Sequence, residues 1–142
     1  MAALNIGYTS GVFDLFHVGH VNLLRSARAM CDKLIVGVTI DDLVLYKNKR
    51  AVIPFHERIA VVQACRYVDV TVPQDNMNKR VAFDRYKFDV MFVGDDWHES
   101  DRWNALDKEF SALGVRIIYL PYTKGTSSTL VNETLENLRA EQ

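Results

Sequence analysis

The chain has 142 residues and 49% hydrophobic composition, which suits one domain with a buried core and is too short for two. Seventeen lysines and arginines against 18 aspartates and glutamates give a formal net charge of −1. This balance argues against broad electrostatic capture of nucleic acid or of an anionic membrane, so any bound anion must be held locally. No run approaches the roughly 20 apolar residues that span a bilayer, and the N-terminus lacks a signal-peptide pattern, so we expect a cytoplasmic protein.

Short apolar runs alternate with segments whose apolar residues recur at three-to-four spacing. The runs predict strands at 4–8, 34–39, 67–72, 90–93 and 115–120, and the segments predict helices at 21–29, 54–66, 77–86, 102–113 and 130–138. The runs 34–38 and 90–93 are continuously apolar, which is typical of a parallel sheet covered on both faces. The pattern predicts one α/β domain over residues 1–142, with a five-stranded parallel sheet and helices on both faces.

In such sheets ligands bind beyond the carboxyl ends of the strands, where the strand order reverses. Small and polar residues gather after four of the predicted strands: Thr9, Ser10, Gly11, Asp14, His17 and His20; Asp41 and Asp42; Gly94, Asp95, Asp96 and Trp97; and the run 122–129. The last run enters a helix through hydroxyl residues, whose side chains and amides can surround phosphate oxygens. Ordinary helix capping is the alternative interpretation of that run.

His17 and His20 stand three residues apart where a strand turns into a helix, so their rings should share one face. Gly19 between them lets another group approach the backbone closely. Such a pair can bind one small anion. Two histidines supply only half of a tetrahedral metal site and no further His or Cys pair follows at ligand spacing, so we expect no protein-held metal. A purely structural role would explain one of the two histidines, but it would not explain both of them together with Gly19 and Asp14.

The segment His17-Val18-Gly19-His20 has the H-x-G-H form of the nucleotidyltransferase superfamily. The longer stretch 11–17 resembles the cytidylyltransferases that activate phosphorylated alcohols, and the segments 66–69, 94–97 and 123–129 match further signatures of that family. In size and layout the chain is most similar to the bacterial glycerol-3-phosphate cytidylyltransferases. The resemblance implies a Rossmann-like nucleotidyltransferase fold and a homodimer.

The resemblance also implies a reaction. The phosphate of an acceptor alcohol attacks the α-phosphorus of CTP in line and releases pyrophosphate, while Mg²⁺ shields the phosphates. The expected acceptor is sn-glycerol 3-phosphate, giving CDP-glycerol for cell-surface polysaccharide biosynthesis. The alternatives are ATP in place of CTP, a different acceptor (phosphoethanolamine, phosphocholine or another polyol phosphate), and a non-catalytic nucleotide-binding module. The expected partners are CTP and a phosphorylated alcohol, with no nucleic acid and no membrane.

By the same resemblance, His17 and His20 stabilise the transition state, and Lys47 and Lys49 contact phosphates. The residues expected to contact the nucleotide are Ser10, Gly11, Val12, Phe13, Asp14, Gly19, Asp95, Tyr122, Thr123, Gly125, Thr126, Ser127, Ser128 and Thr129. Those expected to contact the acceptor are Arg66, Asp69, Met77, Asp96 and Trp97. Asp14 either orients the first histidine or lies near the metal. The alternative interpretation of the two lysines is a solvated basic loop. For residues 94–97 it is a turn, and for Arg66 with Asp69 it is a surface ion pair.

Three positions depart from the family pattern. Tyr122 stands where relatives have an arginine that contacts the nucleotide, and a phenol cannot copy the charged fork of a guanidinium. Lys124, two residues on, restores the charge without the bidentate geometry. Met77 stands about where the glycerol-3-phosphate enzymes have a tryptophan, and Val12 replaces a threonine. The H-x-G-H chemistry is intact, and the departures bear on the choice of nucleotide and acceptor.

Overall fold

The computed structural model describes residues 5–46, 50–94, 101–121, 123 and 128–141. Five strands, β1 (Ile6–Gly11), β2 (Lys33–Thr39), β3 (Val70–Gln74), β4 (Val90–Gly94) and β5 (Arg116–Leu120), form one sheet. The strand order is β3-β2-β1-β4-β5, and every neighbouring pair is parallel. The predicted five-stranded parallel sheet is confirmed, and the strand order reverses between β1 and β4.

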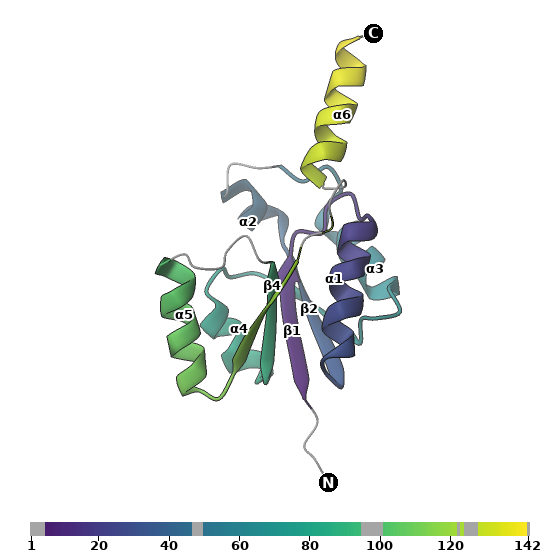
Figure 1. Ribbon diagram of the computed structural model, residues 1–142. Helices are drawn as coiled ribbons and strands as arrows, with labels where there is room; N and C mark the ends of the chain where they lie inside the picture. Colours follow the sequence, from purple (N-terminus) through teal and green to yellow (C-terminus); the bar gives the residue numbers. More distant parts are fainter. Residues whose placement is uncertain (1–4, 47–49, 95–100, 122, 124–127, 142) are drawn as a thin grey trace.

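Helices cover both faces of the sheet, as predicted. They are α1 (Val18–Ala29), α2 (Asp41–Tyr46), α3 (Phe55–Ala64), α4 (Lys79–Tyr86), α5 (Asp101–Ala112) and α6 (Ser128–Ala140). Helices α1 and α3 lie on one face and α4 and α5 on the other, while α6 projects beyond the carboxyl ends of the strands (Figure 1). No helix in the described ranges has both the length and the apolar character needed to cross a membrane.

The core is two apolar layers that the sheet separates. Residues of β2 alternate between them: Leu34 and Val36 join the α1 and α3 side, and Ile35 joins the α4 and α5 side with Phe110. This is the period-two alternation of a strand. Each large apolar side chain buried in this way contributes about 1.5–3 kcal/mol. Both faces of the sheet are therefore fixed by burial, and its carboxyl edge is left for polar side chains.

The boundaries of β1 and β3 differ from the prediction by two or three residues at each end, those of the other strands by one residue at one end, and one helix was not predicted. Strand β1 runs to Gly11 because its backbone pairing with β2 continues that far through small and polar residues. Strand β3 begins at Val70, since Val68 turns back to bond Cys65 O and Asp69 bonds the start of β2. Helix α2 is short, and its two leading aspartates suit a helix N-terminus.

The strand order reverses between β1 and β4. Within the described strands, β1 and β4 are in register at Gly7 with Val90 and at Tyr8 with Met91, whereas β1 and β2 stay paired to Gly11. The register pairs of β1 with β4 therefore end earlier than those with β2. This is where a ligand is expected in a doubly wound sheet.

Candidate functional site

The two histidines form the first turn of α1, directly beyond the end of β1. His17 is the N-cap residue and His20 stands at the third helical position, with ring centroids 4.0 Å apart. The His17 Nδ1 accepts a hydrogen bond from the Gly19 amide at 3.0 Å, and the His20 Nδ1 accepts one from the His17 amide at 3.2 Å. The two rings thus build a capping box in which imidazoles replace the usual side chains. The prediction that they share one face is confirmed.

This capping arrangement sets the proton positions on the rings. Because each Nδ1 is an acceptor, a neutral ring carries its proton on Nε2. Burial lowers the pKa of His17; burial, with a smaller contribution from His17, lowers the pKa of His20 to about 4, although the Asp14 carboxylate acts in the opposite direction. Both rings are therefore uncharged at neutral pH. Each presents an Nε2–H donor, which can stabilise a phosphoryl oxygen by hydrogen bonding.

Aromatic side chains hold His20 in place. The Phe16 ring stacks on it with centroids 5.2 Å apart, and the Phe13 ring lies tilted at 5.3 Å. Phe13 and Leu15 have φ values of 55° and 49°, in the left-handed region that L-residues seldom adopt. Strain of this kind costs about 1–3 kcal/mol per residue and persists where surrounding structure enforces it. The Phe13 side chain, expected to contact the nucleotide, is buried against His20.

Gly19 is required by a close approach. A Cβ at this position would lie 2.7 Å from His17 Cε1 and 2.9 Å from its Nδ1, so any side chain would displace the ring. The same Cβ would lie 3.6 Å from the Cβ of Thr123. Thr123 also accepts a hydrogen bond from Asn22 on α1 at 2.9 Å. The structure thus brings Thr123, which follows β5, to the helix turn that carries the histidines.

Asp14 and Arg58 hold the segment that follows the predicted lysines. The Asp14 carboxylate accepts hydrogen bonds from the amides of Val52 and Ile53 at 2.8 and 2.9 Å. Neither role expected for Asp14, orienting a histidine or lying near a metal, is required to explain these contacts. The Arg58 guanidinium, 1% exposed, donates to Asp41 and to three backbone carbonyls. One of these carbonyls is that of Val12, so this residue takes part through its backbone.

Lys79 is a site residue that the sequence reasoning missed. It is the first residue of α4, and its Nζ donates to Ser10 Oγ at 2.7 Å, which places a cation at the carboxyl end of β1. The predicted third strand ended at residue 72, so the residues beyond its true end at Gln74 were not inspected as strand-end candidates. Met77 precedes Lys79 in the same connection and is half-buried.

Arg66 and Asp69 are not brought to the histidines. Asp69 accepts from the Leu34 amide at 2.8 Å and pairs with Arg28 at 2.9 Å. Leu34 is in register with Gly7, four residues before the end of β1, or about 13 Å along the strand. Asp69 therefore lies at the amino edge of the sheet, where its carboxylate stabilises the start of β2. Arg66 is exposed and donates to the Tyr67 hydroxyl, so neither residue reaches the carboxyl end of β1 in its own chain.

Several expected contacts lie outside the described residues. These are Lys47, Lys49, Asp95, Asp96, Trp97, Tyr122, Gly125, Thr126 and Ser127. For Ser128 and Thr129 the structure describes the helical backbone that opens α6. The assignments for all of these residues remain predictions.

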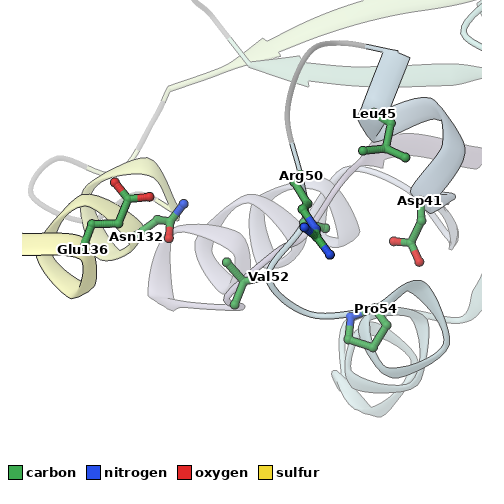
Figure 2. A pocket seen from close by; sticks show the side chains of 8 residues that line it. Asp41, Leu45, Arg50, Val52, Pro54, Asn132 and Glu136 are labelled. Atoms are coloured by element: carbon green, nitrogen blue, oxygen red, sulfur yellow. The ribbon is translucent and has the colours of Figure 1, made fainter. Parts of the chain in front are cut away.

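Two hollows flank the segment held by Asp14 and Arg58. One, of about 650 Å³, is bounded by α2, by the segment 50–54 and by α6; Asn132 and Glu136 face it from α6 (Figure 2). The other, of about 560 Å³, is lined by His17 and by mainly apolar side chains that include Phe16 and Val61. The second hollow, whose lining is mainly apolar and includes the Glu57 carboxylate, does not suit phosphate oxygens.

The described residues include no group of three His, Cys, Asp or Glu side chains that could hold a metal ion. His17 and His20 each have one ring nitrogen committed to a backbone amide. The uncharged imidazoles and the Lys79 ammonium are donors that suit phosphate groups, and the Asp14 carboxylate is occupied by the Val52 and Ile53 amides.

Comparisons with known proteins agree with this geometry. A family described as Cytidylyltransferase-like matches residues 8–134. The glycerol-3-phosphate cytidylyltransferase of Bacillus subtilis is 33% identical over 131 residues, which cover 92% of this chain and 96% of that protein. The ethanolamine-phosphate cytidylyltransferase of Arabidopsis thaliana is 40% identical over 96 residues, 63% of this chain and 22% of that protein. A crystal structure of the lipopolysaccharide core biosynthesis protein from Thermoplasma volcanium shares the fold, with a TM-score of 0.73, 22% identity, and coverage of 87% of this chain and 100% of that one. The chain belongs to the Cytidylyltransferase-like family.

Proposed function

We propose that the protein transfers CMP from CTP to the phosphate of sn-glycerol 3-phosphate, giving CDP-glycerol and pyrophosphate. The observation that carries the proposal is the pair of Nε2–H donors on His17 and His20 at the carboxyl end of β1. The similarity to a glycerol-3-phosphate cytidylyltransferase over 92% of the chain supports the acceptor. The similarity to an ethanolamine-phosphate cytidylyltransferase makes phosphoethanolamine the second candidate.

In the proposed reaction, a phosphate oxygen of the acceptor forms a bond to the α-phosphorus of CTP. The bond from that phosphorus to the oxygen that bridges to the β-phosphate breaks, and pyrophosphate leaves. Such a transfer needs positioning and charge stabilisation more than covalent participation by the protein. Hydrogen bonds from His17 and His20 to the α-phosphoryl oxygens would strengthen as negative charge accumulates there. One such preorganised donor is worth about 2.7–4 kcal/mol in the transition state.

Different lysines of the site would bind the phosphate of the acceptor and the triphosphate of CTP. The Lys79 ammonium lies at the end of β1 on Ser10, and we propose that it binds the phosphate of the acceptor. Lys47 and Lys49 would contact the triphosphate. Asp14 holds the segment that follows these lysines through the Val52 and Ile53 amides, so the residues after the lysines have a fixed position.

We expect Mg²⁺ to accompany CTP. Magnesium is commonly bound through substrate phosphates and only one or two carboxylates, and it supplies charge neutralisation on the phosphates. The described residues offer no cluster of three ligands, which suits an ion held mainly by the triphosphate. Asp95 and Asp96, outside the described residues, are the remaining candidates to assist.

We also propose that the protein is a homodimer. Arg66 is exposed beside Tyr67, and the guanidinium groups of Arg25 and Arg66 lie 5.7 and 5.0 Å from the centre of the Tyr67 ring. Aromatic residues and arginines are enriched in protein interfaces, which supports this surface as the contact. Light scattering should return twice the single-chain mass of 16.2 kDa, and a single-chain mass would exclude the dimer.

The test of the activity is pyrophosphate release by the purified protein with Mg²⁺, using CTP or ATP with a panel of phosphorylated alcohols. Release that requires both CTP and sn-glycerol 3-phosphate is the expected result. Release only with ATP, or only with another acceptor such as phosphoethanolamine, would refute the named substrates and retain the chemistry. CTP binding without release across the whole panel would indicate a non-catalytic nucleotide-binding module.

A further inference from the structure

Ser10 stands between a lysine and a buried tyrosine at the end of β1. Its Oγ accepts a hydrogen bond from Lys79 Nζ at 2.7 Å. A lysine ammonium can only donate, so the Ser10 hydroxyl proton is free to bond elsewhere. The Tyr8 hydroxyl lies nearby, beside the Gly37 backbone, and burial raises the pKa of Tyr8 to about 12 against the opposing effect of Ser10. Lys79, Ser10 and Tyr8 thus lie in a row from the end of β1 into the core.

The inner end of this row is rigid. Tyr8 is 1% exposed, and its ring stacks on Phe88 with centroids 4.9 Å apart and on Tyr86 at 5.9 Å. Gly37 on β2 makes room for the hydroxyl: a Cβ there would lie 2.5 Å from the Tyr8 oxygen and 3.3 Å from the Ser10 Cβ. Gly37 is also the register partner of Ser10. The absence of a side chain at Gly37 therefore leaves room for the Tyr8 hydroxyl beside Ser10.

We propose that Ser10, packed beside the Tyr8 hydroxyl, is a positioning residue for the acceptor site: it holds the Lys79 ammonium at the end of β1 so that it is preorganised for the acceptor's phosphate. The consequence for catalysis depends on the transfer reaction proposed above, whereas the positioning itself does not. A free lysine side chain carries about 2 kcal/mol of rotamer entropy, part of which a phosphate must otherwise offset on binding. Ser10 was expected to contact the nucleotide. Because its hydroxyl bonds Lys79, we now expect its contribution to appear in the affinity for the acceptor and not in that for CTP.

The kinetic test compares Ser10→Ala, Tyr8→Phe and the double variant with a matched control, Thr9→Val. Thr9 is the neighbouring residue on β1, and its hydroxyl donates to Phe92 O at 3.0 Å. Ser10→Ala should raise the KM for sn-glycerol 3-phosphate about tenfold and leave the KM for CTP within about twofold. Thr9→Val should leave the KM for the acceptor within about twofold of wild type.

The double variant separates positioning from stability. Ser10→Ala alone leaves the buried Tyr8 hydroxyl beside a methyl group, which costs stability, whereas removing both hydroxyl groups leaves two apolar groups and should restore most of it. The KM for the acceptor should nevertheless stay raised in the double variant. A KM that recovers together with the thermal midpoint would overturn the proposal, because the effect would then be structural.

Two further results can overturn it. In a Lys79→Met background, Ser10→Ala should have no additional effect on the acceptor KM, and an undiminished effect there would show that Ser10 does not act through the lysine. NMR of the lysine ammonium groups needs no turnover and so stands apart from the proposed activity. The Lys79 Nζ–H signal should be protected from exchange in wild type and exchange faster in Ser10→Ala; an unchanged signal would refute the positioning even if the enzyme is active.

Discussion

Replacing Arg58 by methionine tests the clamp that joins α3 to the loops around the site. The guanidinium donates to the carbonyl oxygens of Ile53, Val12 and Thr39, each at 2.8 Å, and to the Asp41 carboxylate at 2.6 Å. Methionine fills a similar length with apolar atoms and makes none of these bonds. The carboxylate side chain is half exposed, so water can replace the lost bond there. The three carbonyls are the main cost.

An acceptor that loses its donor in a buried place costs about 1 kcal/mol or more, so three such carbonyls amount to about 3 kcal/mol. Removing the buried cation also removes its own desolvation cost, which keeps the sum from rising further. A loss of about 3 kcal/mol is a large fraction of the 5–15 kcal/mol that stabilises a typical domain. We therefore expect Arg58→Met to fold but to be strongly destabilised.

Urea unfolding measures this loss as a lower midpoint at unchanged m-value. The matched control is Arg80→Met, because Arg80 pairs with Asp84 at 3.1 Å and Glu109 at 3.4 Å on the surface. Exposed pairs of this kind contribute at most about 1 kcal/mol. If Arg58→Met costs less than about 1 kcal/mol, or no more than the control, the clamp does not stabilise the fold as reasoned here.

Three further predictions concern the histidine turn. First, His20→Ala should lower kcat about 100-fold or more through loss of the Nε2–H donor, while circular dichroism stays native; turnover within tenfold of wild type would contradict the role. Second, because the folded pKa of His20 lies near 4, below its usual 6.5, the stability it supports is full above about pH 6.5 and declines as the pH falls towards 4. Proton NMR should show the His20 ring titrating below pH 5, and a midpoint near 6.5 would exclude the buried neutral ring. Third, Gly19→Ala should improve helix propensity by up to about 1 kcal/mol yet displace the His17 ring, so kcat should fall at least tenfold without loss of thermal stability; unchanged kcat would show that the ring is not held by this contact.

The sheet and the histidine turn could be predicted because their signals are local. Continuous apolar runs such as those of β2 and β4 indicate buried strands by themselves. Their alternation with helices is compatible with few sheet topologies. The pairing of His17 with His20 follows from helical spacing within a single turn. Gly19 was expected to admit a close neighbour, and that neighbour proved to be the His17 ring itself.

The remaining features depend on contacts that cross the fold. Lys79 meets Ser10 from 69 positions away, and Asp14 meets the Ile53 amide from 39. Nothing in the immediate neighbours of a lysine or an aspartate says which strand end it will touch. Asp69 shows the opposite case, since a carboxylate near a predicted strand was expected at the acceptor pocket and instead serves the amino edge of the sheet.

The two ring nitrogens of His17 have different roles. Its Nδ1 stabilises the fold because it closes the first turn of α1, and its Nε2 is left for the proposed reaction. Asparagine can also cap a helix through its side-chain oxygen, but it has no donor at the reach of Nε2. Many residues are therefore acceptable to the helix at position 17, and few to the chemistry. If His17 acts as proposed, one such exchange would give an inactive form that still folds and keeps the surface of the enzyme.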